Sequence, residues 1–310
     1  MLIRHRLSQR DGSSDFPWIR DRWRVVRSQG IDCGLHDRLP GRYPVLCAPI
    51  LDPRGHGLGR RLLNGDRDHA RHCREGWFWM AHRDGERIYS DFAVVAGEGV
   101  WCRHTVEVPG GADGSGYWVV QDRSRPRLEH HCLTWIRSNL AGYTGMLNIE
   151  TIAGRIIDAR SGVSDRWPDL YGRKWSDAVL RLYEYGTWDL LDAERADGYS
   201  LDLFGPRGQP LDYPDGRLMA HAATVGISSV RLCGDVAPGE CPEVRLAVIN
   251  CFNLQVGLRI RLELARDFEL LREREAAGDR NSARGRELPA AHLRGTSAAS
   301  LAANSLSNRL

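Results

Sequence analysis

Between residues 43 and 122, short runs of apolar residues alternate with polar ones, which is the pattern of half-buried strands. Within the second of these runs the apolar Ile88, Phe92 and Val94 stand two or four positions apart. Gly- and Asp-rich turns separate the runs, so we expect a strand-rich segment made of YPVLC (43–47), RIYSDFAVVAG (87–97), GVWCRHTVEV (99–108) and GYWVVQD (116–122).

Helical spacing appears in three later stretches. Residues 130–145 place apolar side chains three and four positions apart and end in AGYTG, which predicts a helix and its stop. WSDAVLRLYEYGTW (175–188) predicts a second helix, with Ser176 as its N-cap. Residues 253–271 predict a third, because Leu254, Leu258 and Leu262 share one face with later apolar residues.

The stretch GMLNIETIAGRIIDAR reads as a hairpin, since two apolar strands flank an Ala-Gly turn. In such a pair Asn148 and Glu150 come close to the level of Asp158 and Arg160, and residues two apart share a face. Two carboxylates and an amide oxygen are ligands that Mg²⁺ prefers, so Asn148, Glu150 and Asp158 form a candidate metal site. An exposed hairpin with ordinary surface acids is the plainer alternative.

A second candidate feature follows the first predicted strand. Gly55, Gly57 and Gly59 alternate with other residues, and Arg60 and Arg61 come next. Glycine lets successive backbone N–H groups converge on an anion, and arginine adds charge-assisted hydrogen bonds to phosphate. A turn between two strands explains the glycines equally well.

Composition narrows the function classes only slightly. The 310 residues are 42% hydrophobic and 27% charged, with a formal net charge of +3, which does not favour nucleic acid as a partner. Lys174 is the single lysine among the 43 lysine and arginine residues.

The eight cysteines show no C-x-x-C spacing and favour reduced, buried thiols. With no signal peptide or spanning segment visible, we expect a cytoplasmic protein.

Two further stretches could carry chemistry but favour plainer roles. DHARHC (68–73) offers His69, His72 and Cys73, but a structural zinc site needs four ligands, and we expect a solvated turn. SDRWPDLYGRKW (164–175) interleaves arginines with aromatic residues. Packing is the expected role of these aromatics, although the stretch follows the acidic hairpin and could line a substrate cleft.

The order of these parts resembles the ATP-grasp superfamily. That family shows a PvvvKP strand, a glycine-rich loop, an acidic strand and a hairpin ending in iEvNpR. This chain has YPVLCAP, GHGLG, DGERIYSDFAVVAG and LNIETIAGRIIDARSG in the same order over roughly residues 43–165. The resemblance implies an α+β fold with antiparallel sheets and packed helices, ATP held between two sheets, and Mg²⁺ on Glu150 and Asp158. By position, Gly55, His56, Gly57, Gly59 and Arg60 would contact the nucleotide.

The chain departs from the family's motifs at three positions. Ala48 stands where the lysine before the proline is expected, Arg160 stands where the final motif has asparagine, and Gly162 stands where it has arginine. An arginine beside the glycine loop could replace the lost lysine charge. Arg160 is the candidate catalytic residue. The resemblance divides the chain into a reduced N-terminal segment (1–42), an ATP-grasp-like domain (43–195), a β-rich region with a closing helix (196–272) and a disordered tail (273–310).

Two functions follow from this resemblance. The first is an Mg·ATP-dependent ligase that activates a small-molecule carboxylate as an acyl phosphate for attack by an amine or thiol. The second is a non-catalytic binding or structural protein on a degenerate ATP-grasp scaffold, which the changes at Ala48 and Gly162 favour. Hydrolysis by a metal on Glu150 and Asp158 is a third alternative, but no nucleophile or base is visible. Substrate identity and oligomeric state stay open.

Overall fold

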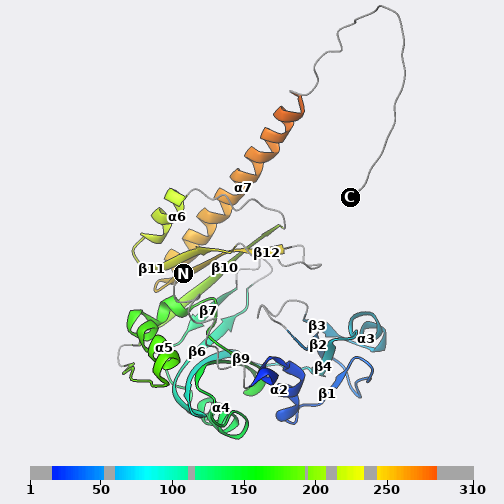
Figure 1. The fold of residues 1–310 in the computed structure, drawn as a ribbon. Coiled ribbons are helices and arrows are strands. Elements are labelled where there is room, and N and C mark those ends of the chain that lie inside the picture. Colours follow the sequence, from blue (N-terminus) through cyan, green and yellow to red (C-terminus); the bar gives the residue numbers. More distant parts are fainter. Residues whose placement is uncertain are drawn as a thin grey trace, which may run out of the picture.

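The computed structural model describes residues 16–51, 60–110, 116–192, 195–206, 215–233 and 243–284. Antiparallel strands form two sheets, and helices cover them, so the predicted α+β class is confirmed (Figure 1). The helices are η2 (Pro17–Arg20), α2 (Arg22–Ser28), α3 (Asp66–His72), α4 (Pro126–Asn139), η3 (Pro168–Tyr171), α5 (Arg173–Tyr185), α6 (Asp215–Ala222) and α7 (Leu254–Arg284).

The smaller sheet has four strands in the order β1-β4-β2-β3, namely β1 (Cys33–Leu35), β4 (Trp77–Ala81), β2 (Val45–Pro49) and β3 (Arg61–Leu63). Its strands are short, and β2 lies between two neighbours with Cys47 and Ala48 fully buried. Gly34 of β1 lies against the ring of Trp79 in β4, and a Cβ there would come 2.7 Å from that ring. Only glycine therefore permits this approach of the two strands.

The larger sheet has eight strands in the order β11-β12-β10-β7-β6-β5-β8-β9. Their bounds are β5 (Arg87–Val95), β6 (Glu98–Val108), β7 (Tyr117–Val120), β8 (Gly145–Ile152), β9 (Arg155–Ser161), β10 (Gly198–Pro206), β11 (Ile227–Leu232) and β12 (Glu243–Cys251). Strands β8 and β9 form the predicted hairpin. Ala153 and Gly154 at its turn have φ values of 49° and 74°, as the two central residues of a type I′ turn require.

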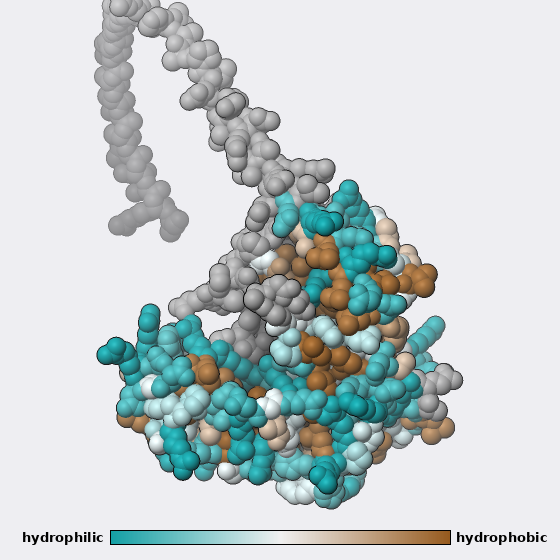
Figure 2. Space-filling model, turned by 180° about the vertical axis from the view of Figure 1, so that it is seen from behind, coloured by the Kyte–Doolittle hydropathy of each residue, from teal (hydrophilic) through white to brown (hydrophobic). Residues whose placement is uncertain are grey.

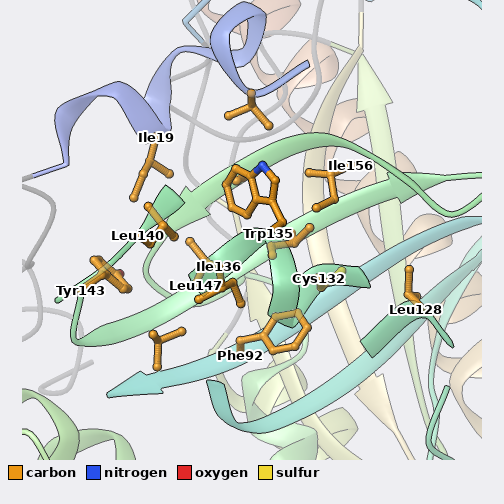
Figure 3. Packing of buried hydrophobic residues seen from close by; sticks show 14 of the residues in the cluster. Ile19, Phe92, Leu128, Cys132, Trp135, Ile136, Leu140, Tyr143, Leu147 and Ile156 are labelled. Carbon is orange, nitrogen blue, oxygen red and sulfur yellow. The ribbon is translucent and has the colours of Figure 1, made fainter. Parts of the chain in front are cut away.

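The main core lies between one face of the larger sheet and helix α4 (Figure 3). Cys132 and Ile136 of α4 lie near Phe92 of β5 and Leu147 of β8, and these four residues are buried (Figure 3). The buried Trp135 ring extends toward α2, where its Nε1 donates to Oγ of Ser28. The 3.6-residue spacing seen in the sequence thus places the apolar face of α4 on the sheet. This layer fixes β5, β8 and β9, and it leaves their opposite face for the site described below.

The predicted domain boundaries do not coincide with breaks in the sheets. Strand β1, from the N-terminal segment, pairs with β4 of the smaller sheet. Strand β10 pairs with β7, so the larger sheet runs from the second predicted region into the third. Helix α7 extends to Arg284, past residue 273, and residues 285–310 lie outside the described residues. These pairings join residues distant in sequence, which a local pattern does not reveal.

Two local predictions were wrong. Ser176 is not an N-cap, because α5 begins at Arg173 after Gly172 and carries Trp175 on its buried face. The stretch DHARHC is not a turn: it forms most of α3, whose His69 is buried. In both cases the position of the helix follows the side chain that is buried, Trp175 in α5 and His69 in α3. The N-cap candidate and the charged residues do not determine it.

Exposed apolar side chains occur on several parts of the surface (Figure 2), among them Met219 of α6, Leu262 of α7 and Phe252 directly after β12. Met219 is 67% exposed, Phe252 49% and Leu262 60%. Helix α7 continues away from the body of the molecule (Figure 1). Among the described helices, none combines the length and apolar composition that crossing a bilayer requires.

Candidate active site

An irregularity in the hairpin places the candidate residues on one face. Glu150 pairs with Asp158, whereas Thr151 pairs with Ile156, so Ile157 is an extra residue in β9. Ile157 packs in the cluster that contains smaller-sheet residues, and Ile156 packs in the α4 core on the other face. The bulge therefore turns both Ile157 and Asp158 toward the smaller sheet. It leaves Asp158 directly across from Glu150 in the neighbouring strand.

Glu150 is buried and bonded by two arginines. Its side chain is 1% exposed. Arg60, directly before β3, donates from Nη1 to Oε1 at 2.5 Å and from Nη2 to Oε2 at 2.6 Å. Arg87 of β5 donates from Nε to Oε1 at 2.8 Å. Both carboxylate oxygens therefore accept charge-assisted hydrogen bonds, and Arg60 joins the smaller sheet to the larger one.

Asp158 is surrounded in the same way. Its side chain is 2% exposed, and its Oδ2 accepts hydrogen bonds from Nε of Arg160 at 3.0 Å and from Nη2 at 2.5 Å. Nε of Arg22, on α2, lies 3.3 Å from the same oxygen, and Nη2 of Arg60 lies 3.7 Å away. Four guanidinium groups thus surround the two predicted metal carboxylates.

The charges around Glu150 set its protonation state. Burial by itself raises the pKa of Glu150, but the charges of Arg60 and Arg87 outweigh this and hold it well below its ordinary value. Burial lowers the pKa of Arg22, and the nearby Asp158 only partly offsets this because Arg60 and Arg160 are close as well. Glu150 is therefore ionised, in surroundings with an excess of positive charge.

These residues, as they are placed, do not fit a divalent cation. A Mg²⁺ ion needs carboxylate oxygens turned toward it in a nearly octahedral arrangement. Both oxygens of Glu150 and Oδ2 of Asp158 are engaged by guanidinium groups, whose positive charge also repels a cation. The third predicted ligand, Asn148, donates from Nδ2 to Oδ1 of Asp91 at 2.7 Å.

The Asp91 carboxylate holds several side chains on the neighbouring part of this face through hydrogen bonds. Besides Asn148, it accepts hydrogen bonds from Nε1 of Trp167 at 2.8 Å and from the hydroxyl of Tyr171 at 2.6 Å. The carboxylate is 2% exposed and also accepts from the backbone N–H of Ser164, so these donors replace the water it would otherwise bind. The aromatic stretch that follows the hairpin therefore packs on the sheet and fixes Asn148 through Asp91.

A small pocket lies beside the acid pair, between the two sheets. It is partly open to solvent and has room for about one water molecule. Its lining is largely apolar and comes from the smaller sheet, the segment after it, and the hairpin: Ile31, Leu46, Met80, Ala81, His82, Arg83, Ile152 and Ile157. Because Ile157 is next to Asp158, the pocket and the guanidinium cluster are adjacent parts of one face. The two parts place an apolar surface next to concentrated positive charge.

The structure brings together some predicted residues and adds others. Glu150, Asp158, Arg160 and Arg60 lie together, whereas Gly55, His56, Gly57 and Gly59 fall within residues 52–59, outside the described residues. Sequence reasoning missed Arg22 and Arg87. A signal for Arg22 exists, since it stands three and four positions before Val25 and Val26 on the buried face of α2.

The opposite face of the larger sheet holds a separate polar cluster. His104 lies 2.8 Å from Oγ of Ser90 through Nδ1 and 3.1 Å from Oε1 of Glu129 through Nε2. Cys102 is close enough for its sulfur to share a metal ion with these side chains. Both ring nitrogens of His104 already have partners, and Ser90 is fully buried, so the cluster satisfies buried polar groups.

Comparison with solved structures finds the same fold in several enzymes. An L-amino acid ligase from Bacillus licheniformis aligns with a TM-score of 0.54 at 10% identity, over 83% of this chain and 71% of that one. A carboxyaminoimidazole ribonucleotide synthase from Aspergillus clavatus, complexed with ATP, gives 0.55 at 11%, over 82% and 74%. The biotin carboxylase domain of a Hydrogenobacter thermophilus 2-oxoglutarate carboxylase, with MgADP, ADP and bicarbonate, gives 0.51 at 11%, over 77% and 63%.

No family model and no curated protein matches the chain by sequence. At 10–11% identity the structural matches concern the fold alone. That fold agrees with the order of motifs in the sequence, including a hairpin with paired acids that faces a small four-stranded sheet. The chain has the fold of the ATP-grasp superfamily.

Proposed function

We propose that this chain binds ATP between its two sheets, with the adenine against the apolar residues that line the small pocket and the phosphates over the guanidinium cluster. The observation that carries the proposal is the adjacency of the two parts. Leu46, Ala81 and Ile157 line the pocket, and Arg60 and Arg160 lie next to it on the acids. Neighbours of the same fold include complexes with ATP and with MgADP.

The activity proposed first is that of a ligase, in line with the L-amino acid ligase among the neighbours. A carboxylate oxygen of a small substrate would attack the γ-phosphorus of ATP, and ADP would leave. An amine or thiol would then attack the acyl carbon of the acyl phosphate, and phosphate would leave. In this scheme Arg160 and Arg60 would neutralise charge on the transferring phosphoryl group, as arginines do in other phosphoryl transfers.

A second candidate is a non-catalytic nucleotide-binding protein. Two observations favour it. Ala48, at the position of the family's lysine, is fully buried among apolar residues of the smaller sheet, and the acid pair is already neutralised by arginines. The two candidates share ATP binding and differ in turnover. ADP release on addition of mixed carboxylates and amines would identify a ligase, and its absence with intact ATP binding would identify a binding protein.

ATP binding itself is tested by calorimetric titration of the full chain and of an Ala81→Trp variant, which fills the pocket. We expect ATP to bind the wild type and to lose at least tenfold in affinity in the variant. Ala141→Trp, an equally large change at an exposed turn after α4, is the matched control and keeps the wild-type affinity. Failure of ATP to bind the wild type, or equal affinities in both variants, would refute the proposal.

A further inference from the structure

The acid pair differs from a metal site in its charge. Arg22, Arg60, Arg87 and Arg160 carry four positive charges around the two carboxylates of Glu150 and Asp158. The only further acid bonded to this group in the described residues is Glu107, whose Oε2 accepts from Nη1 of Arg87 at 3.0 Å. Among the described residues, the cluster therefore has four guanidinium groups against three carboxylates.

Buried donors in the cluster lack acceptors. In the part of the chain that the structure describes, Nη2 of Arg22 and Nε of Arg60 have no hydrogen-bond partner. The Arg22 side chain is 1% exposed and that of Arg60 is 10% exposed, so water replaces these bonds poorly. A buried guanidinium donor without an acceptor is costly. These unpartnered donors indicate that an anion completes the site.

We propose that the guanidinium groups of this cluster replace the divalent cation, so that the site holds the polyphosphate of a nucleotide in its metal-free form. This inference rests on the proposed ATP site and adds how its phosphates are neutralised. Arg60 and Arg22 supply the donors, while Glu150 and Asp158 orient the guanidinium groups rather than hold a metal. Guanidinium N–H groups suit phosphate oxygens because the hydrogen bonds they donate are charge-assisted.

The charges of the site predict whether Mg²⁺ strengthens or weakens nucleotide binding. Free ATP carries two more negative charges than its complex with Mg²⁺, and a site lined by four guanidinium groups prefers the more negative form. A cation bound to the phosphates would also lie next to arginines and be repelled. We therefore expect Mg²⁺ to weaken nucleotide binding roughly tenfold or more at low ionic strength.

The experiment compares three titrations of the full chain: ATP in EDTA, ATP in excess MgCl₂ at the same ionic strength, and inorganic triphosphate in EDTA. The inference expects ATP and triphosphate to bind in EDTA, and ATP to bind more weakly with Mg²⁺. It also expects Mn²⁺ alone, followed by its spin-resonance signal, to stay free in solution. These measurements use the wild type, so they do not depend on a variant that folds.

Each result separates the two proposals. ATP that binds only with Mg²⁺, or Mn²⁺ held by the protein alone, overturns metal replacement and leaves ATP binding intact. Triphosphate that binds in EDTA while ATP binds under neither condition overturns the ATP site and retains the anion site. Absence of all binding overturns both. Arg60→Gln should weaken triphosphate binding at least tenfold, whereas Arg137→Gln, which removes an arginine from an exposed pair on α4, should leave it unchanged.

Discussion

Replacing Glu150 by glutamine distinguishes an arginine-bound acid from a vacant metal ligand. In the structure the carboxylate accepts three hydrogen bonds from Arg60 and Arg87, and the variant leaves both buried guanidinium groups without its charge. Removing one partner of a buried ion pair typically costs about 3–5 kcal/mol. Arg87 is 27% exposed and regains some hydration, so we expect the lower part of that range, about 3 kcal/mol.

The loss is measured as a shift in the urea midpoint at constant slope, or as a fall in Tm of about 6–12 °C. Glu98→Gln is the matched control, because Glu98 pairs with Arg137 at the surface, where both side chains are more than half exposed. Its loss should cost less than about 1 kcal/mol. If Glu150 and Asp158 instead repelled each other at an empty metal site, Glu150→Gln would stabilise the protein. A variant as stable as the wild type would refute the charge assignment.

Three further perturbations test other parts of the structure. Burial lowers the pKa of His104, with Glu129 only partly offsetting it, so the unfolded chain takes up the proton first and stability falls as pH drops below about 6.5. Urea midpoints at pH 7.5 and 5.5 measure this, and an equal difference in His104→Gln would contradict it. Gly34→Ala should cost about 1–3 kcal/mol of unfolding free energy, because the new Cβ overlaps Trp79, while Gly41→Ala, with open space, costs little. Asp91→Asn leaves at least one of the donors around this side chain unpaired and should lower stability by about 2–3 kcal/mol in the same assay, with an unchanged midpoint as the contrary result.

Local pattern was enough to predict the hairpin and its acids. The period of two along β8 and β9, with an Ala-Gly turn between them, places Glu150 level with Asp158, and the structure pairs them directly. The fold class and the resemblance to the ATP-grasp superfamily followed from the order of such segments and are confirmed. These features depend on residues close together in the sequence.

What the sequence did not reveal depends on contacts between distant segments. Arg22 and Arg87 reach the acids from α2 and β5, and no spacing rule connects positions that far apart. The extra residue Ile157 is likewise invisible in the hydrophobic pattern, because a bulge changes which face a side chain takes without changing its type. Predicting the ligands of a cation from acids alone therefore omitted the arginines that neutralise them.

Arg60 belongs to the segment that begins β3, whereas Glu150 belongs to the hairpin of the other sheet. Their ion pair, with two parallel hydrogen bonds, links the two sheets at the place where the proposed ligand would bind. Any motion that parts the sheets has to break this pair. An anion bound at the unpartnered Nε of Arg60 would leave the pair intact and so would hold the two sheets together.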